Sequence, residues 1–419
     1  TAGRLMSSPE LHETRAFSRS IIGTWFLVVL SVVSWRPDPL FTGGVDGVVF
    51  AKALLAFTAF GCALLIHKRS TTRARVGVRS AILLFIVVGL SVLGAVASGD
   101  VSPSLVLALR ILLLGATVYV LASSAPPMRV LTAQFIAMGI LALTGAVTGV
   151  PSFFAEGRLA TGFPAMRPNE LAGLTAPPLL ALVIDAARTG LTTRKTVLLV
   201  AFASILLATG SRTTIVVVVI AIVAGVLMAW PVPHSTGIAL ILLVPFFYAL
   251  AAFTTVVSEV VIRGQNIEQL TTLSSRTIAW DAVLSIPIDT WHKWIGVGLA
   301  VKTVEVNQRW WDVQVLDSSW ISILSQAGIV GLIAVGLWVL FAIRDSLRSR
   351  ELRVLAFPML VLLLLRSGLE NGLIESSVIF AVFFLTSLVV ESGYRFPFEH
   401  RRTVHYSLAL PPATLTRTR

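Results

Sequence analysis

The chain has little charge for its size. Only 13% of its 419 residues are Asp, Glu, Lys or Arg, about half the share that soluble domains carry. Hydrophobic residues make up 56%, and apolar stretches recur along nearly the whole length between short polar connectors. This composition excludes an ordinary water-soluble protein. It predicts one polytopic domain in a lipid bilayer, spanning residues 1–419.

Cysteine and histidine are also scarce. The single cysteine, Cys62, lies in an apolar run, which excludes an intrachain disulfide and a cysteine-based metal site. Of the six histidines, only His292 falls on the side that charge assigns to the outside. The sequence shows no internal repeat and no low-complexity tract.

The apolar stretches predict an all-α polytopic membrane protein with about twelve transmembrane helices, since a spanning helix needs roughly 20 mostly apolar residues. Connectors at Gly99 and Gly210 are so short that the flanking helices must form hairpins. One connection is long, 257–316, and contains two segments that predict short helices at the membrane interface. The spans are expected near 20–37, 46–67, 80–98, 101–124, 128–149, 168–187, 194–209, 211–230, 235–256, 317–343, 353–368 and 373–392.

The net charge of +12 is distributed unevenly. In total, 21 of the 33 basic residues fall in the two terminal segments and in connections near 68–79, 129, 188–195 and 344–353. Excess Lys and Arg is typical of cytoplasmic connections. Both termini are therefore predicted to be cytoplasmic, and the 257–316 loop extracytoplasmic. This distribution accounts for the positive charge without nucleic acid as a partner.

Eight arginines are predicted on the outer side, against this bias. Each one alone can be explained by a side chain that extends to lipid headgroups. Five of them flank spans, the tight hairpin or a loop helix, and as a set they can converge on one outer cavity. Guanidinium groups bind phosphate bidentately and stay charged, so the set predicts a site for a lipid phosphate or diphosphate. The five are Arg158, Arg167, Arg212, Arg276 and Arg366, and the others are Arg36, Arg263 and Arg309.

Two further cations are predicted inside spans. Arg110 lies about nine residues and Lys52 about six residues from the outer ends of their helices. Charges within the bilayer are costly and are functional by default. Lys52 can instead extend outward to the interface, whereas Arg110 lies deeper. Both are candidates for binding an anionic substrate.

A general base is harder to identify. Asp317 begins a span directly after the long loop, where partial desolvation would favour proton uptake. The alternative is an N-cap for a helix starting at Ser318, and one residue can serve both purposes. The other candidates are His292, Glu370 and Glu375.

Six of the ten tryptophans fall between Trp280 and Trp320. Tryptophan at a membrane interface usually belongs to the aromatic belt or packs against neighbours. It also stacks on the C–H faces of sugar rings. Trp280 is therefore a candidate for sugar binding, with the belt or packing as the alternative.

Five motifs occur in order: TGFPAMRPNELAGL (161–174), LATGSRTT (207–214), SSRTIAWDAVL (274–284), WIGVGL (294–299) and DSSWISILSQAGIVGL (317–332). Over roughly 160–335 the chain resembles the O-antigen ligase and O-antigen polymerase superfamily of bacterial membrane glycosyltransferases. The resemblance places Asn169 in the motif that opens a middle span. It matches Arg212 to the family's hairpin arginine and Arg276 to its loop-helix arginine. Arg167 or Arg158 matches the arginine before the middle span.

The resemblance implies a type C glycosyltransferase-like fold in the bacterial cytoplasmic membrane, with an extracytoplasmic active site. Such enzymes move a glycan from a polyprenyl-diphosphate-linked oligosaccharide to a hydroxyl of a glycan or lipid acceptor, without metal or cofactor. Ligases that use lipid A–core carry histidine where this chain has Asp317, which favours a polysaccharide polymerase or a different ligase. The alternative class is a transporter, a flippase of a lipid-linked glycan, which would use Lys52 and Arg110. Transporters typically show internal repeats.

Overall fold

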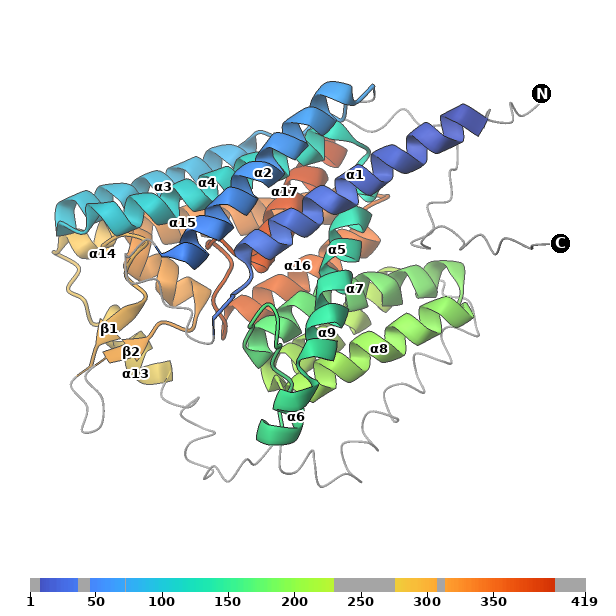
Figure 1. Ribbon diagram of the computed structural model, residues 1–419. Coiled ribbons are helices and arrows are strands. Elements are labelled where there is room, and N and C mark those ends of the chain that lie inside the picture. Colours follow the sequence, from blue (N-terminus) through green and yellow to red (C-terminus); the bar gives the residue numbers. More distant parts are fainter. Residues whose placement is uncertain (1–7, 37–45, 72, 230–275, 307–312, 396–419) are drawn as a thin grey trace.

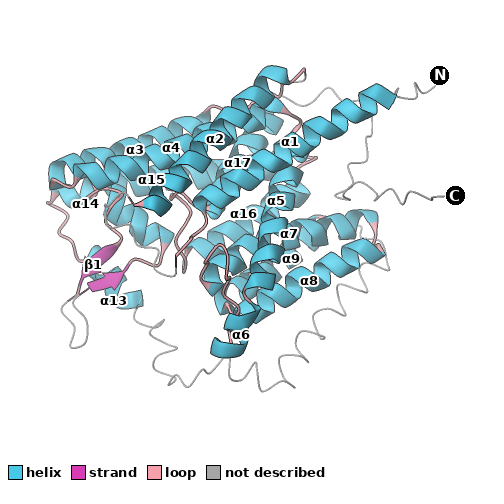
Figure 2. Ribbon diagram, in the orientation of Figure 1, coloured by secondary structure: helices cyan, strands magenta, loops and turns pink. Residues whose placement is uncertain are grey.

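The computed structural model describes residues 8–36, 46–71, 73–229, 276–306 and 313–395, which form a helical bundle with one small sheet (Figures 1 and 2). The first helices are α1 (Ser8–Val32), α2 (Gly47–Arg69), α3 (Arg79–Ser98), α4 (Val101–Ser124), α5 (Pro127–Thr148), α6 (Val150–Glu156), α7 (Pro168–Thr189), α8 (Thr193–Thr209) and α9 (Arg212–Met228). The later elements are α13 (Arg276–Leu284), α14 (Trp291–Ile295), β1 (Thr303–Glu305), β2 (Val313–Val315), α15 (Ser319–Arg348), α16 (Arg353–Ser367) and α17 (Val378–Arg395).

Eleven of the predicted spans correspond to helices, and the one near 235–256 lies outside the described residues. Within the described ranges, six helices are long and apolar enough to cross a membrane, namely α2, α3, α4, α5, α7 and α15. The apolar parts of α1, α9 and α17 are shorter, as are α8 with 17 residues and α16 with 15. The protein is thus a mostly helical multi-pass membrane protein. The number of twelve spans stays a prediction.

The prediction of an all-α fold is wrong at one place. The two predicted loop helices are present as α13 and α14, but β1 and β2 form an antiparallel sheet beside them, in which Val304 pairs with Gln314. Strands of three residues are too short to show an alternating pattern in the sequence. The short helix α6 was also not predicted, because seven residues carry no helical periodicity.

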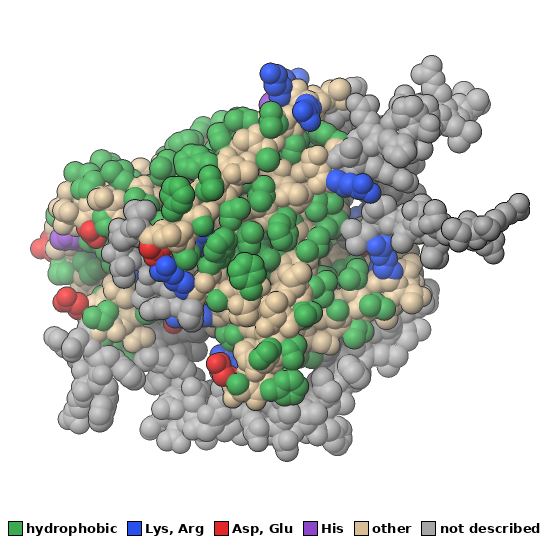
Figure 3. Space-filling model, viewed as in Figure 1, with side chains coloured by type: hydrophobic (Ala, Val, Ile, Leu, Met, Phe, Trp, Pro, Cys, Tyr) green, Lys and Arg blue, Asp and Glu red, His purple; other side chains and the backbone are tan. Residues whose placement is uncertain are grey.

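Aromatic packing around α17 forms the centre of the bundle. Trp338 of α15 is 1% exposed and packs against Phe383 and Phe384, with ring centroids 5.0 and 5.8 Å away. In contrast, α2 and α3 expose large apolar side chains such as Phe57 and Phe85. Figure 3 shows hydrophobic side chains across the middle of one face, with Lys and Arg towards its edges. This is the distribution expected of a surface in contact with lipid.

Polar contacts tie the helix ends together in two groups. At one end, Arg79 at the start of α3 pairs with Asp345 near the end of α15, and Glu391 of α17 accepts hydrogen bonds from the backbone N–H of Arg79 (2.9 Å) and Ser80 (3.0 Å). At the other end, the backbone N–H after α1, at Ser34, donates to the α7 side chain of Glu170. These pairings agree with the predicted alternation of spans. Which end faces outside stays a prediction.

Sidedness can be tested with two cysteines on an otherwise cysteine-free chain. With Cys62 replaced, Ser285→Cys, exposed just after α13, should react with a membrane-impermeant thiol reagent in intact cells. Thr71→Cys, exposed between α2 and α3, should react only after permeabilisation. The charge bias predicts this difference. The reverse labelling pattern would overturn the orientation.

Candidate functional site

A chain of hydrogen bonds joins several segments at the predicted outer end of the bundle. Arg158, which follows α6, donates from Nε to the carbonyl oxygen of Thr209 (3.0 Å) and from Nη2 to Oδ1 of Asn169 (3.1 Å). The Asn169 amide in turn donates to Oε1 of Glu370 at 2.9 Å. We call these contacts the outer relay. They connect the α6–α7 segment, the end of α8 and the segment after α16.

Arg366 anchors the outer relay from within the bundle. Its residue is only 5% exposed, and its Nη2 donates to the backbone oxygen of Asn169 at 3.1 Å. The carboxylates of Glu370 and Glu170 interact with it electrostatically, as a buried guanidinium requires. Glycine at position 173 makes room, since a Cβ there would lie 2.9 Å from Nη2 of Arg366.

The start of α15 is fastened to the same segment. The hydroxyl of Ser319 donates to the backbone oxygen of Glu370 at 2.9 Å. Asn371 accepts a hydrogen bond from the Ser322 hydroxyl at 2.8 Å and donates to the backbone oxygen of Leu316. The residues on both sides of Asp317 are therefore held next to the outer relay.

Asp317 itself is partly exposed. The predicted helix start at Ser318 is wrong by one residue, because α15 begins at Ser319 and Ser318 occupies the N-cap position. The suggestion that Asp317 is the N-cap is therefore also wrong. An N-cap residue is the last one before the helical dihedral angles begin, and that residue is Ser318.

The tight α8–α9 hairpin is present as predicted. Gly210 has φ 61°, a left-handed conformation that glycine adopts without strain. The Ser211 hydroxyl contacts the Thr214 hydroxyl at 3.0 Å, and α9 begins at Arg212. Because Thr209 is part of the outer relay, the partly buried Arg212 lies at the same end of the bundle as Arg158.

The hydrogen bonds described above do not include the other predicted site residues. The side chain of Arg276, the first residue of α13, lies outside the described part of the structure. Arg167 precedes α7 and is exposed. The His292 ring stacks on Trp291, with centroids 3.8 Å apart, in α14. Trp280 packs against a small core containing Val283 and Leu316, which favours the packing alternative.

Two predicted outer charges form ion pairs. Glu375 pairs with Lys302, so it is a weaker candidate for the base. Arg36 pairs with Asp46 at 2.6 Å, and Asp46 also caps α2. The remaining predicted cations, Lys52 and Arg110, line a cavity among α1, α2 and α4. Arg263 and Arg309 lie outside the described residues.

Glu170 and Asn371 are site residues for which sequence reasoning predicted no role. Glu170 accepts the Ser34 N–H at 2.6 Å and interacts with both Lys52 and Arg366. Each directly follows a candidate residue, Asn169 or Glu370, and this adjacency is the only signal in the sequence. In the described ranges, no group of three or more His, Cys, Asp or Glu side chains is placed to hold a metal ion.

The Gly-x-Gly motif and the start of α15 interlock through their backbones. Val297 donates to the Ser325 oxygen at 2.9 Å, and Gly298 donates to the Gln326 oxygen at 3.1 Å. Gly296 has φ 75°, and a Cβ there would lie 2.3 Å from the backbone carbon of Gln326. These glycines allow the loop backbone to contact the α15 backbone, which fixes α14 against α15.

The apolar helices define a multi-pass membrane protein in which charged and amide side chains gather at one end of the bundle. Residues 197–336, from within α8 to the middle of α15, match the family model described as O-Antigen ligase. This match confirms the resemblance to the O-antigen ligase and O-antigen polymerase superfamily. The match suggests a glycosyl-transfer activity of the kind found in that family. Among curated proteins, none matches the chain.

The interlocked glycines give a stability prediction. Gly296→Ala should destabilise the protein by about 2–4 kcal/mol, since the added Cβ overlaps the α15 backbone and strains a positive φ. Thermal unfolding of the purified protein measures this change. Gly61→Ala in α2 is the control, because a Cβ there meets nothing within 4 Å and alanine is favoured in a helix. Equal melting temperatures for the two variants would contradict the interlock.

Proposed function

We propose that the protein transfers a glycan from a polyprenyl-diphosphate donor to an acceptor hydroxyl at the outer face of the cytoplasmic membrane. It would act as a polysaccharide polymerase or an O-antigen-ligase-like enzyme. The observation that carries this proposal is the outer relay. It brings the hairpin that bears Arg212 and the segment that bears Asp317 to one end of the bundle.

In the proposed reaction, the Asp317 carboxylate accepts the proton of the acceptor hydroxyl. The hydroxyl oxygen forms a bond with the anomeric carbon of the donor sugar, on the face opposite the diphosphate. The bond between that carbon and the diphosphate oxygen breaks, and its electron pair stays on the diphosphate. The anomeric configuration is inverted, and neither a metal nor a nucleotide sugar is required.

Arginines supply the stabilisation that the leaving group needs. Negative charge grows on the diphosphate as the bond breaks, and fixed guanidinium groups stabilise that charge without having to reorganise. In this proposal Arg212 and Arg276 contact the diphosphate together with Arg158 or Arg167. The tight hairpin limits the motion of Arg212, which follows Gly210 by two residues.

A flippase of a lipid-linked glycan is the alternative, because Lys52 and Arg110 line a cavity within the bundle. Incubation of the purified protein with a synthetic polyprenyl-diphosphate oligosaccharide and an acceptor distinguishes the two functions. The transferase gives elongated or ligated products that mass spectrometry resolves. A flippase leaves both reactants chemically unchanged.

The same assay tests the arginine clamp. Arg212→Ala and Arg276→Ala should each lower turnover about a hundredfold or more, the order expected when one transition-state donor is lost. Arginine to lysine should restore little, because a point charge replaces a bidentate group. Arg188→Ala, exposed in the last turn of α7, is the matched control at the opposite end of that helix from Arg167. Full activity of both alanine variants would exclude the clamp.

The base is tested by Asp317→Asn, which keeps the size of the side chain but does not accept a proton. Turnover should fall by roughly a hundred- to ten-thousandfold, while folding and donor binding are retained. Asp317→His should keep part of the activity if histidine serves in this position. Normal turnover of Asp317→Asn with loss in His292→Ala would move the base to the loop. Loss only in Glu370→Gln would assign it to the outer relay.

A further inference from the structure

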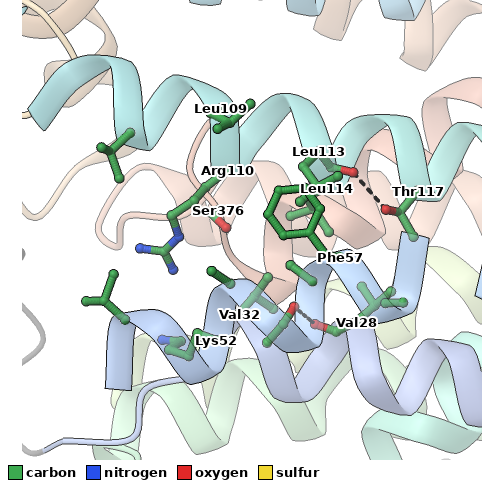
Figure 4. Close-up of a pocket in the computed structure, with 16 residues that line it drawn as sticks. Val28, Val32, Lys52, Phe57, Leu109, Arg110, Leu113, Leu114, Thr117 and Ser376 are labelled. Atoms are coloured by element: carbon green, nitrogen blue, oxygen red, sulfur yellow. Dashed lines mark hydrogen bonds between the residues drawn. The ribbon is translucent and has the colours of Figure 1, made fainter. Parts of the chain in front are cut away.

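A cavity of about 130 Å³ lies among α1, α2 and α4, apart from the hydrogen bonds of the outer relay (Figure 4). Its lining is mostly valine, alanine and leucine, with Phe57 at one side. The volume corresponds to about four water molecules. It accommodates a phosphate group and the first carbons of one chain, but is too small for the paired chains of a diacyl phospholipid.

Two cations reach into this apolar cavity. Figure 4 shows Lys52 from α2 and Arg110 from α4 at the same end of it, and the two interact repulsively. In the part of the chain that the structure describes, neither side chain forms a hydrogen bond or an ion pair within 4.0 Å. Both residues are partly buried, and holding two like charges in a mostly apolar lining is unfavourable unless an anion joins them.

The one carboxylate that interacts with Lys52 is Glu170, among the described residues. Glu170 also interacts with the buried Arg366 and accepts the Ser34 N–H, so its charge is shared between the cavity and the outer relay. Lys52 and Arg366 therefore share the Glu170 carboxylate, Arg366 also interacts with Glu370, and no carboxylate among the described residues interacts comparably with Arg110. This excess of positive charge predicts a bound anion on the cavity side.

The cavity also borders the lipid-facing surface. Phe57 and Leu109, which line it, are 55% and 60% exposed. An amphiphile can therefore place its charged end between Lys52 and Arg110 while its chain remains in contact with apolar helix surfaces. A fully water-soluble anion would gain nothing from the valine and alanine lining.

We propose that this cavity binds the chain-proximal phosphate of a single-chain polyprenyl lipid, with Lys52 and Arg110 contacting the phosphate oxygens and the chain lying against α1 and α2. The proposal rests on the proposed function, in which donor and released carrier are lipids of this kind. Glu170, which interacts with both Lys52 and Arg366, then links this phosphate site to the outer relay.

Binding of polyprenyl monophosphate to the purified protein, measured by native mass spectrometry, tests the proposal. Lys52→Met and Arg110→Leu should each weaken binding about tenfold or more, since a charge-assisted contact is lost. Ala56→Phe, which keeps both cations and fills the apolar lining, should weaken binding as well. Lys68→Met, exposed at the far end of α2, is the matched control and should bind as the wild type does. Melting temperatures show that each variant is folded.

Competition with other probes identifies the ligand. Inorganic phosphate and phosphatidylglycerol should each displace polyprenyl phosphate only weakly. Equal competition by phosphatidylglycerol, equal competition by inorganic phosphate, or undiminished binding by the Lys52→Met/Arg110→Leu double variant overturns the proposal. Should the double variant fail to fold, undiminished binding by Ala56→Phe overturns it instead.

Glycan transfer measured in the same preparations separates the two proposals. If the wild type transfers glycan and the variants still bind lipid undiminished, the proposed lipid site is overturned, whereas the proposed glycosyltransferase function stands. If the variants lose lipid binding but the wild type transfers no glycan, the proposed glycosyltransferase function is overturned, whereas the proposed lipid site stands.

Discussion

Asn169 binds three charged residues from three different segments. Its side-chain oxygen accepts from Arg158, its side-chain nitrogen donates to Glu370, and its backbone oxygen accepts from Arg366. An amide can do this because it carries a donor and an acceptor on one rigid group. A carboxylate could not donate to Glu370, and an apolar residue would keep the backbone contact with Arg366 but lose both side-chain contacts, to Arg158 and to Glu370. The arrangement of the outer end therefore depends on this amide.

The contacts of Asn169 surround a charge, that of Arg366, which is buried in the bundle. Arg366 lies at the end of an apolar helix and is nearly inaccessible, so its charge is tolerated only with carboxylates and hydrogen bonds close by. Those partners come from α7 and from the segment after α16, which cannot separate without exposing a buried charge. These linked segments therefore form a rigid scaffold that holds Arg158 and the start of α15. Fixed positions are what electrostatic catalysis requires.

Several features of this scaffold could be predicted from the sequence. The apolar lengths located eleven helices, and Gly210 with Ser211 located the hairpin that carries Arg212. Long-range partners could not be predicted, since Asn169 and Glu370 are 201 residues apart and no local pattern links them. Local patterns also missed the three-residue strands and α6, because each is too short to show a repeated pattern of burial. Asp317 was expected at a helix start, but the cap is Ser318.

The two sets of cations differ in how their charge is balanced. Around the buried Arg366, Nη2 donates to the backbone oxygen of Asn169, and two carboxylates interact with the guanidinium. Around Lys52 and Arg110 the lining is mostly apolar, and Lys52 interacts with the shared Glu170. A purely structural cation would be expected to resemble Arg366 in having two carboxylates and a backbone oxygen as partners, since folding alone favours partners for a buried charge. Lys52 and Arg110 have fewer such partners, as a binding site for an anion requires. An anion that binds there forms new ion pairs with both cations, and the favourable free energy of these pairs contributes to its binding.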